Sequence, residues 1–329
     1  MSLRTVCVVV TLIQLVAPSP LVAQPAAKAY RMGFLAYQRC PDVLDTNGPF
    51  LRGLGDLGYV SGQNLVIDCR DAIGHFDRLP QLAAELARLT IDVLVTEGTP
   101  QSLAGKRATA TIPIVMIGVG DPVGSGLVAS LARPGGNITG SAMFPAVEIV
   151  LKGLELLKEI APGVSRIAVV WDPANLALIS VDKQLDTASR PLKVELRRIS
   201  VRSAGDVQDA FTSIRGHSAQ ALLVHPLPVG PAGVERIGRF ALENALPLIT
   251  WSEVLAPLDG VLFSYGPQFT DVYGRAAGLV DRVLRGAHPA ELPVEQPSKF
   301  SLVINLRTAK ALRLTIPPSL LLRADRVIE

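Results

Sequence analysis

Residues 79–117 read LPQLAAELARLTIDVLVTEGTPQSLAGKRATATIPIVMI, a segment in which helical and strand patterns alternate. The first part carries apolar residues three and four positions apart, which places them on one helix face: Leu79, Leu82, Ala83, Leu86 and Ala87. The apolar run 91–95 then predicts a buried strand, and a second helix over 100–110 leads into a second strand over 114–117. This order is typical of a parallel sheet covered by helices.

The same alternation continues in both directions from this segment. Helices are expected over Phe50–Leu57 and near Lys152–Ile160, and a glycine-rich break at 133–137 interrupts the series. Further strands are expected at Arg31–Ala36, Asn64–Cys69, Arg166–Trp171, Lys193–Ile199, Ala219–Val224 and Leu246–Trp251. The sequence therefore predicts an α/β fold of two doubly wound lobes with parallel sheets and a ligand cleft between them.

The N-terminus has the pattern of a secretory signal peptide. Arg4 precedes an uncharged apolar run, residues 6–17, that is too short to cross a bilayer as a helix. We expect a signal peptide over residues 1–23, cleaved after Ala23, and a secreted, periplasmic mature protein. The alternative is an uncleaved N-terminal anchor, because the positive region is a single arginine.

Composition limits the classes of partner and cofactor. The formal net charge is +3, and no basic run is longer than Arg197-Arg198, so we expect no nucleic-acid partner. Two cysteines remain after cleavage, Cys40 and Cys69, and either a disulfide or two free thiols is compatible with the sequence. The four histidines are scattered and no C-x-x-C occurs, so we expect neither a metal nor another cofactor.

The loops that follow the predicted strands carry the candidate ligand contacts, because open parallel sheets bind ligands beyond the carboxyl ends of their strands. Thr99 and Pro100 are interpreted as an N-cap and a first helical residue, which would turn the positive end of a helix toward an anionic group. Asp121 and Asp172 would meet an ammonium or hydroxyl group. Each of these three polar residues has an equally simple alternative, which is to cap its own helix.

Three ring-bearing residues also lie at or near predicted strand ends. Trp251 and Tyr265 would stack on an apolar part of a ligand, and His225 would contact it. The alternative for the two aromatic residues is a place in the core, and for His225 a structural hydrogen bond.

Enzymatic motifs are absent or misspaced. Gly118, Gly120 and Gly124 are one residue out of step with a dinucleotide fingerprint, and the sequence around Gly105 and Lys106 lacks the hydroxyl of a phosphate loop. No Gly-x-Ser-x-Gly elbow occurs. The prediction is a protein without catalytic residues.

Several longer motifs resemble those of the ABC transporter substrate-binding family that includes tryptophan- and tyrosine-binding members. They are residues 54–64 (LGDLGYVSGQN), 118–124 (GVGDPVG), 131–140 (LARPGGNITG), 292–297 (LPVEQP), 303–306 (VINL) and 316–321 (IPPSLL). The resemblance covers nearly the whole mature chain. It implies the type I periplasmic-binding-protein fold, a small-molecule solute as ligand, and docking to an ABC permease with its ATPase; we expect a monomer.

The resemblance further implies three chain crossings between the lobes. The first lobe would hold residues 30–141 plus 263–289, and the second lobe 142–262 plus 290–329. By the same analogy the ligand contacts would come from both lobes: Tyr37, Gln38, Thr99, Gln101, Asp121, Asn175, His225, Trp251 and Tyr265.

Two other functions remain open from the sequence. A solute sensor would present its closed form to a signalling receptor rather than to a permease. A secreted α/β enzyme would use an acidic residue as a general base.

Overall fold

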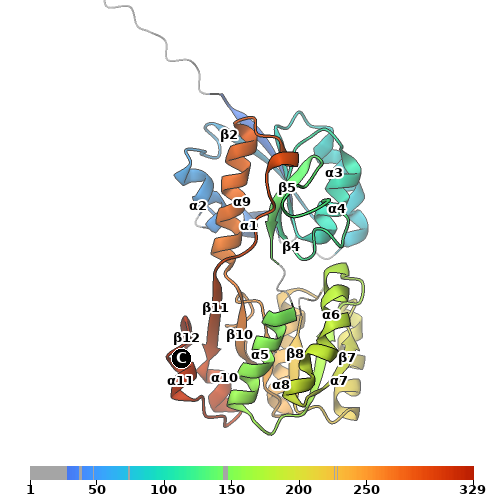
Figure 1. Cartoon of the computed structure of the whole chain (residues 1–329), viewed down its shortest axis with the longest axis vertical. Helices are drawn as coiled ribbons and strands as arrows, with labels where there is room; N and C mark the ends of the chain where they lie inside the picture. Colours follow the sequence, from blue (N-terminus) through green and yellow to red (C-terminus); the bar gives the residue numbers. More distant parts are fainter. Residues whose placement is uncertain are drawn as a thin grey trace, which may run out of the picture.

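The chain folds into two lobes, each built on its own β-sheet (Figure 1). The structure is a computed structural model, and it describes residues 28–36, 39–46, 48–72, 75–143, 147–225, 227 and 229–329. The expected signal peptide, Tyr37 and Gln38 lie outside these residues. Among the described residues, no helix combines the length and the apolar character needed to cross a membrane.

The first lobe contains a five-stranded sheet in the order β2-β1-β3-β4-β5, with every neighbouring pair parallel. Its strands are β1 (Tyr30–Ala36), β2 (Leu65–Asp71), β3 (Val93–Glu97), β4 (Ile114–Val119) and β5 (Ile138–Ala142). Its helices are α1 (Cys40–Val43), α2 (Pro49–Asp56), α3 (Leu79–Ala87), α4 (Thr99–Ala108) and α9 (Phe269–Leu284), and η1 (Phe76–Arg78) and η4 (Pro289–Glu291) are short 3₁₀ turns. β3 is buried along its whole length, as expected for a central strand covered on both faces.

The second lobe contains a seven-stranded sheet in the order β12-β11-β10-β9-β8-β6-β7. Its strands are β6 (Arg166–Trp171), β7 (Glu195–Ser200), β8 (Ala221–Val224), β9 (Leu248–Thr250), β10 (Val261–Pro267), β11 (Phe300–Asn305) and β12 (Arg326–Ile328). Its helices are α5 (Val147–Ile160), α6 (Leu176–Ser189), α7 (Val207–Gly216), α8 (Gly230–Glu243), α10 (Leu306–Ala311) and α11 (Pro318–Leu321), with 3₁₀ turns η2 (Arg190–Leu192) and η3 (Ala204–Asp206). All pairs are parallel except β10 with β11.

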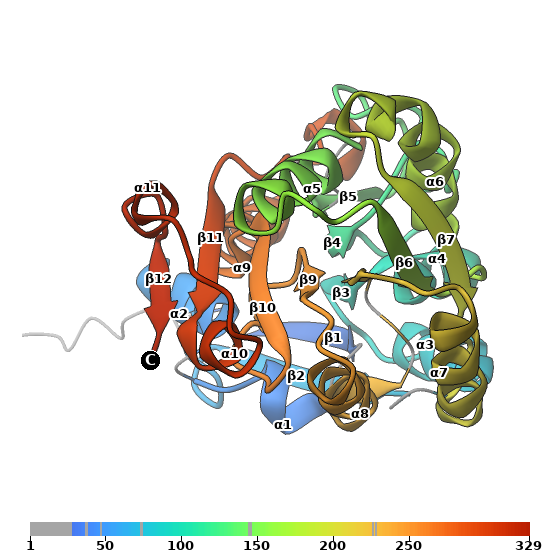
Figure 2. The same cartoon turned by 90° about the horizontal axis from the view of Figure 1, so that it is seen from below.

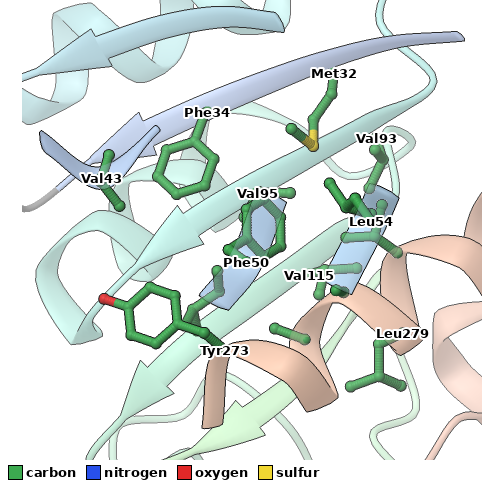
Figure 3. Close-up of a cluster of buried hydrophobic side chains, with 14 of the residues drawn as sticks. Met32, Phe34, Val43, Phe50, Leu54, Val93, Val95, Val115, Tyr273 and Leu279 are labelled. Carbon is green, nitrogen blue, oxygen red and sulfur yellow. The ribbon is translucent and has the colours of Figure 1, made fainter. Parts of the chain in front are cut away.

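Helices cover both faces of each sheet, so each lobe has two apolar clusters. In the first lobe, one cluster joins the sheet to α2 and α9 through residues such as Phe34, Phe50 and Leu279 (Figure 3). The other joins the opposite face to α3 and α4. The second lobe repeats this arrangement with α5 on one face and α7 and α8 on the other (Figure 2). The fold class expected from the sequence is confirmed.

The chain passes three times between the two sheets: between β5 and α5, between β10 and α9, and between η4 and β11. The crossing segments are bonded to each other. Glu295 N donates to Gly140 O (2.9 Å) and Gln268 N donates to Lys299 O (3.0 Å). The Arg275 guanidinium of α9 contacts Glu295 (3.4 Å) and Ser298 (2.6 Å), both in the third crossing. The crossings therefore form one connected region beside the two sheets.

The course of the chain differs from the expected lobe boundaries in two places. Residues 263–267, expected in the first lobe, belong to β10 and pair with β9 and β11 in the second sheet. Residues 292–295, expected in the second lobe, run along β5 in the first, where Thr139 Oγ1 donates to Leu292 O (2.8 Å). Strand partners are chosen by long-range packing, and the local pattern of these segments does not specify which sheet they join.

Candidate ligand-binding site

The end of β3 sets the direction of α4. Gly98 has φ 92° and ψ 169°, a conformation that favours glycine, and its N–H donates to Ile117 O (2.8 Å). The chain then enters α4, so Gly98 is the N-cap residue and Thr99 is the first helical residue. The expectation that Thr99 caps the helix is therefore wrong. Its buried hydroxyl instead accepts a hydrogen bond from Gly120 N (3.3 Å) and joins α4 to the loop after β4.

Gln101 lies in the first turn of α4 and its side chain is fully buried. Neither its amide nitrogen nor its amide oxygen has a hydrogen-bond partner among the described residues. A buried amide without partners loses its hydration and gains no hydrogen bond in return, so it lowers the stability of the free protein. Buried polar groups in this state are rare in native proteins. A ligand that forms hydrogen bonds with the Gln101 amide would explain why the amide is buried without a partner.

Asp121 is engaged by its own turn. Its Oδ1 accepts a hydrogen bond from Gly124 N (2.7 Å), and the side chain is half-buried. Asp172 behaves in the same way, because its Oδ1 accepts from Ala174 N (2.9 Å). Each carboxylate therefore accepts from a backbone N–H two or three residues further on, in the turn that follows its strand, and the helix-capping alternative is not what the structure shows.

His225 and Trp251 are brought together from two neighbouring strands of the second sheet. His225 follows β8 and Trp251 follows β9, and the indole Nε1–H donates to His225 Nδ1 (3.0 Å). Both side chains are buried. Burial lowers the pKa of His225 to about 4, and the nearby charge of Arg198 adds to this effect. The imidazole is therefore neutral at pH 7, with Nδ1 as the acceptor and the proton on Nε2.

The neutral state of His225 predicts a loss of stability on acidification. As the pH falls below about 6.5, the unfolded chain takes up a proton that the folded chain refuses until about pH 4, so stability falls with falling pH. His225 alone is expected to lower the free energy of unfolding by about 2 kcal/mol between pH 7 and pH 5. Urea unfolding of the parent and of His225→Asn across this pH range measures the effect, because asparagine keeps a hydrogen-bond acceptor but does not titrate. A variant whose stability has the same pH slope as the parent would contradict the assignment.

Two features of the strand ends were missed by sequence reasoning. Trp171 ends β6, and its indole Nε1 is buried without a hydrogen-bond partner among the described residues. Its position at the end of the expected strand 166–171 is the sequence signal that could have identified it as a candidate. Glu97 ends β3, is buried, and accepts a hydrogen bond from the hydroxyl of Tyr273 in α9. No local signal connects Glu97 to a residue so far along the chain.

The remaining sequence candidates occupy separate places. Asn175 is half-buried at the start of α6, where its carbonyl accepts from Leu178 N (3.0 Å). Tyr265 lies within β10 and packs against the second-lobe cluster that contains Phe263. The core position considered as the alternative for Tyr265 is therefore consistent with its packing. Tyr37 and Gln38 lie outside the described residues.

Two cavities lie beside strands of the second sheet. One cavity of about 620 Å³ lies between β7 and α7, and another of about 460 Å³ lies beside β10, β11 and β12. Neither is lined by any of the nine candidate residues. Among the described residues, no group of three or more His, Cys, Asp or Glu side chains is placed to hold a metal ion.

Comparison with known proteins places this geometry in a family. The chain is 29% identical to a tyrosine-binding protein of Clostridioides difficile over 270 residues, 80% of this chain and 75% of that protein. A structure from Streptococcus pneumoniae in complex with L-Trp superposes with a TM-score of 0.84 at 24% identity, over 92% of this chain and all of that one. The ligand-free, open structure of a substrate-binding protein from Clostridium difficile superposes with a TM-score of 0.68 at 24% identity, over 91% of this chain and 99% of that one.

The family model described as ABC transporter substrate binding protein matches residues 39–328, which is nearly the whole of the described chain. The two-lobed fold, the three crossings and the motifs quoted above agree with this match. The chain belongs to the ABC transporter substrate-binding protein family.

Proposed function

We propose that this protein is the periplasmic substrate-binding component of an ABC importer, which binds a small solute carrying a carboxylate, such as an amino acid, by lobe closure. The observation that carries the proposal is the fully buried Gln101 amide, which has no partner among the described residues. A ligand would provide the hydrogen bonds that the free protein lacks at this position.

The surroundings of Gln101 favour a carboxylate. The first hydrogen bond at the start of α4 runs from Ser102 N to Gly98 O (3.1 Å), so the helix supplies no acceptor for the N–H groups of Thr99 and Gln101. These groups and the positive end of the α4 dipole attract an anion. The Gln101 amide nitrogen would add a third donor. A carboxylate oxygen pair fits such a set of donors.

Trp171 supports a ligand that also has an apolar part. Its half-buried ring ends β6, and its unpartnered Nε1–H offers a donor on the second lobe. The tyrosine-binding relative and the L-Trp complex, together with a more distant solute-binding protein in complex with benzoate, make aromatic amino acids and aromatic acids the first compounds to test.

Lobe closure is supported by the arrangement of the two lobes. At equal identity, the chain superposes better on the L-Trp complex than on the ligand-free, open structure. The moving bodies that we propose are residues 28–142 with 268–296, and 147–267 with 299–329. Ligand contacts from both lobes would favour the closed state, as in other hinge-closing binding proteins.

The remaining parts of the proposal come from the sequence and the family. The N-terminal pattern supports export to the periplasm, and family membership supports docking to a permease with its ATPase. Gln101, Thr99 and Trp171 are proposed as direct ligand contacts, with no catalytic residue. Asp121 and Asn175 are proposed to hold the loops around them, and the mature protein is proposed to act as a monomer.

Binding of unaltered small molecules to the mature protein tests the proposal. We expect L-tyrosine, L-tryptophan or benzoate to raise the thermal midpoint, because a ligand at a hundred times its Kd adds about 2.7 kcal/mol to the free energy of unfolding. Calorimetry gives the affinity, and mass spectrometry of the recovered compound shows whether it is intact. Chemical conversion of the compound would favour an enzyme, and no stabilisation by any carboxylate would contradict the assigned ligand class.

A further inference from the structure

Trp251 lies in the loop after β9 of the second lobe, yet its ring is buried in the first-lobe cluster. The other members of that cluster come from residues 32–143 and from α9, and they include Met143 and Tyr273. Figure 3 shows Tyr273 at one end of this cluster, on the side opposite Met32. Trp251 therefore makes an apolar contact between the lobes, and moving the lobes apart would expose part of its ring.

His225 fixes the orientation of Trp251 from within the second lobe. Its backbone N–H donates to Val170 O (3.0 Å), which attaches the residue to β6, and its Nδ1 accepts the Trp251 indole N–H (3.0 Å). A buried indole N–H requires an acceptor. His225 provides this acceptor in the rotamer of Trp251 that contacts the first lobe.

We propose that Trp251 and His225 form an interlobe latch, in which Trp251 stabilises the closed arrangement by inserting into the first-lobe cluster and His225 is the positioning residue that holds it. This proposal rests on the lobe closure proposed above, and it gives the two residues a role other than direct ligand contact. The latch adds apolar contact area only in the closed state, so it raises the closed fraction of the free protein. Apparent affinity rises in proportion to that fraction.

Small-angle scattering of the ligand-free mature protein tests the latch without any ligand. Trp251→Ala and His225→Leu are expected to increase the radius of gyration, because the first removes the contact and the second removes the acceptor. His225→Asn, whose amide oxygen can replace Nδ1, is expected to restore the parental value. The matched control is Phe240→Leu: Phe240 stacks on Phe211 (4.2 Å) inside the second lobe, so this variant loses core packing without changing an interlobe contact.

Fluorescence gives a second measurement, because the chain contains two tryptophans. In a Trp171→Phe background, the emission of Trp251 reports its own exposure. We expect a shift to longer wavelength and faster acrylamide quenching in His225→Leu, with both reversed in His225→Asn. Unchanged scattering and unchanged Trp251 emission in His225→Leu would overturn the latch.

Titration with L-tyrosine, excited at 295 nm where the ligand does not absorb, separates the latch from the proposed function. If L-tyrosine binds, Trp251→Ala and His225→Leu are expected to weaken it about tenfold, since the closed state becomes less populated. If the parent binds neither L-tyrosine nor any other carboxylate, the assigned ligand class is contradicted, and the scattering comparison still decides the latch. Equal L-tyrosine affinity in parent and His225→Leu would overturn the latch alone.

Discussion

Replacing Cys40 and Cys69 together by serine is expected to lower the free energy of unfolding by about 3–4 kcal/mol. The two residues form a disulfide with Cα atoms 6.0 Å apart and a sequence separation of 29. The crosslink restricts the unfolded chain, and the loss of loop entropy for a closed loop of this length accounts for the expected size of the effect. Urea unfolding of the mature protein and of the double serine variant measures it.

The reduced parent protein is the matched control, because it keeps both sulfur atoms and loses only the bond. It should show the same loss of stability as the double serine variant, and thiol labelling should find two free thiols only after reduction. Equal unfolding midpoints for oxidised and reduced parent would show that the crosslink does not stabilise the fold. Since Cys40 begins α1 and Cys69 lies in β2, the bond also attaches the segment after β1 to its neighbouring strand.

Replacing Gln101 by methionine is expected to change stability and binding in opposite directions. The ligand-free protein should gain about 1–3 kcal/mol, because an unbranched apolar side chain removes two unpartnered polar atoms from a fully buried position. Affinity for L-tyrosine or L-tryptophan should fall about ten- to a hundredfold, because the ligand loses hydrogen bonds that nothing else in α4 replaces. Thermal or urea unfolding gives the first value and calorimetry gives the second.

Gln81→Met is the matched control for this experiment. Gln81 is exposed on α3, where its amide donates to Glu85 (3.1 Å), so the same substitution there should change stability by less than about 0.5 kcal/mol. Loss of stability in Gln101→Met would mean that the amide is satisfied in the free protein. Gain of stability with unchanged affinity would remove Gln101 from the site.

Local periodicity was sufficient to predict most of the secondary structure. The apolar positions Leu79, Leu82, Ala83 and Leu86 are the buried residues of α3, and the strand expected over 166–171 has the same bounds as β6. The turn residues near Gly98 and Pro100 placed the start of α4 to within one position. These features depend on residues a few positions apart, so the sequence contains all the information needed for them.

The hydrogen-bond partners of the polar side chains were harder to predict than the secondary structure. Asp121 and Thr99 were each open to two interpretations. Asp121 is engaged by Gly124 in its own turn, whereas the Thr99 hydroxyl accepts from Gly120, which the fold brought into reach. The Tyr273 hydroxyl meets Glu97 from 176 residues away. A sequence shows which groups can form hydrogen bonds, but the choice among acceptors is made by packing across the whole lobe.

The sequence by itself therefore determined the alternation of strands and helices, the two-lobed class and the family, because each depends on local pattern or on contiguous motifs. Tertiary structure alone decided the Cys40–Cys69 bond, the joining of β10 to the second sheet and the burial of Trp251 in the first-lobe cluster. The physical reason is that these contacts join segments whose distance along the chain says nothing about their distance in space. They form only when complete sheets and lobes have packed against each other.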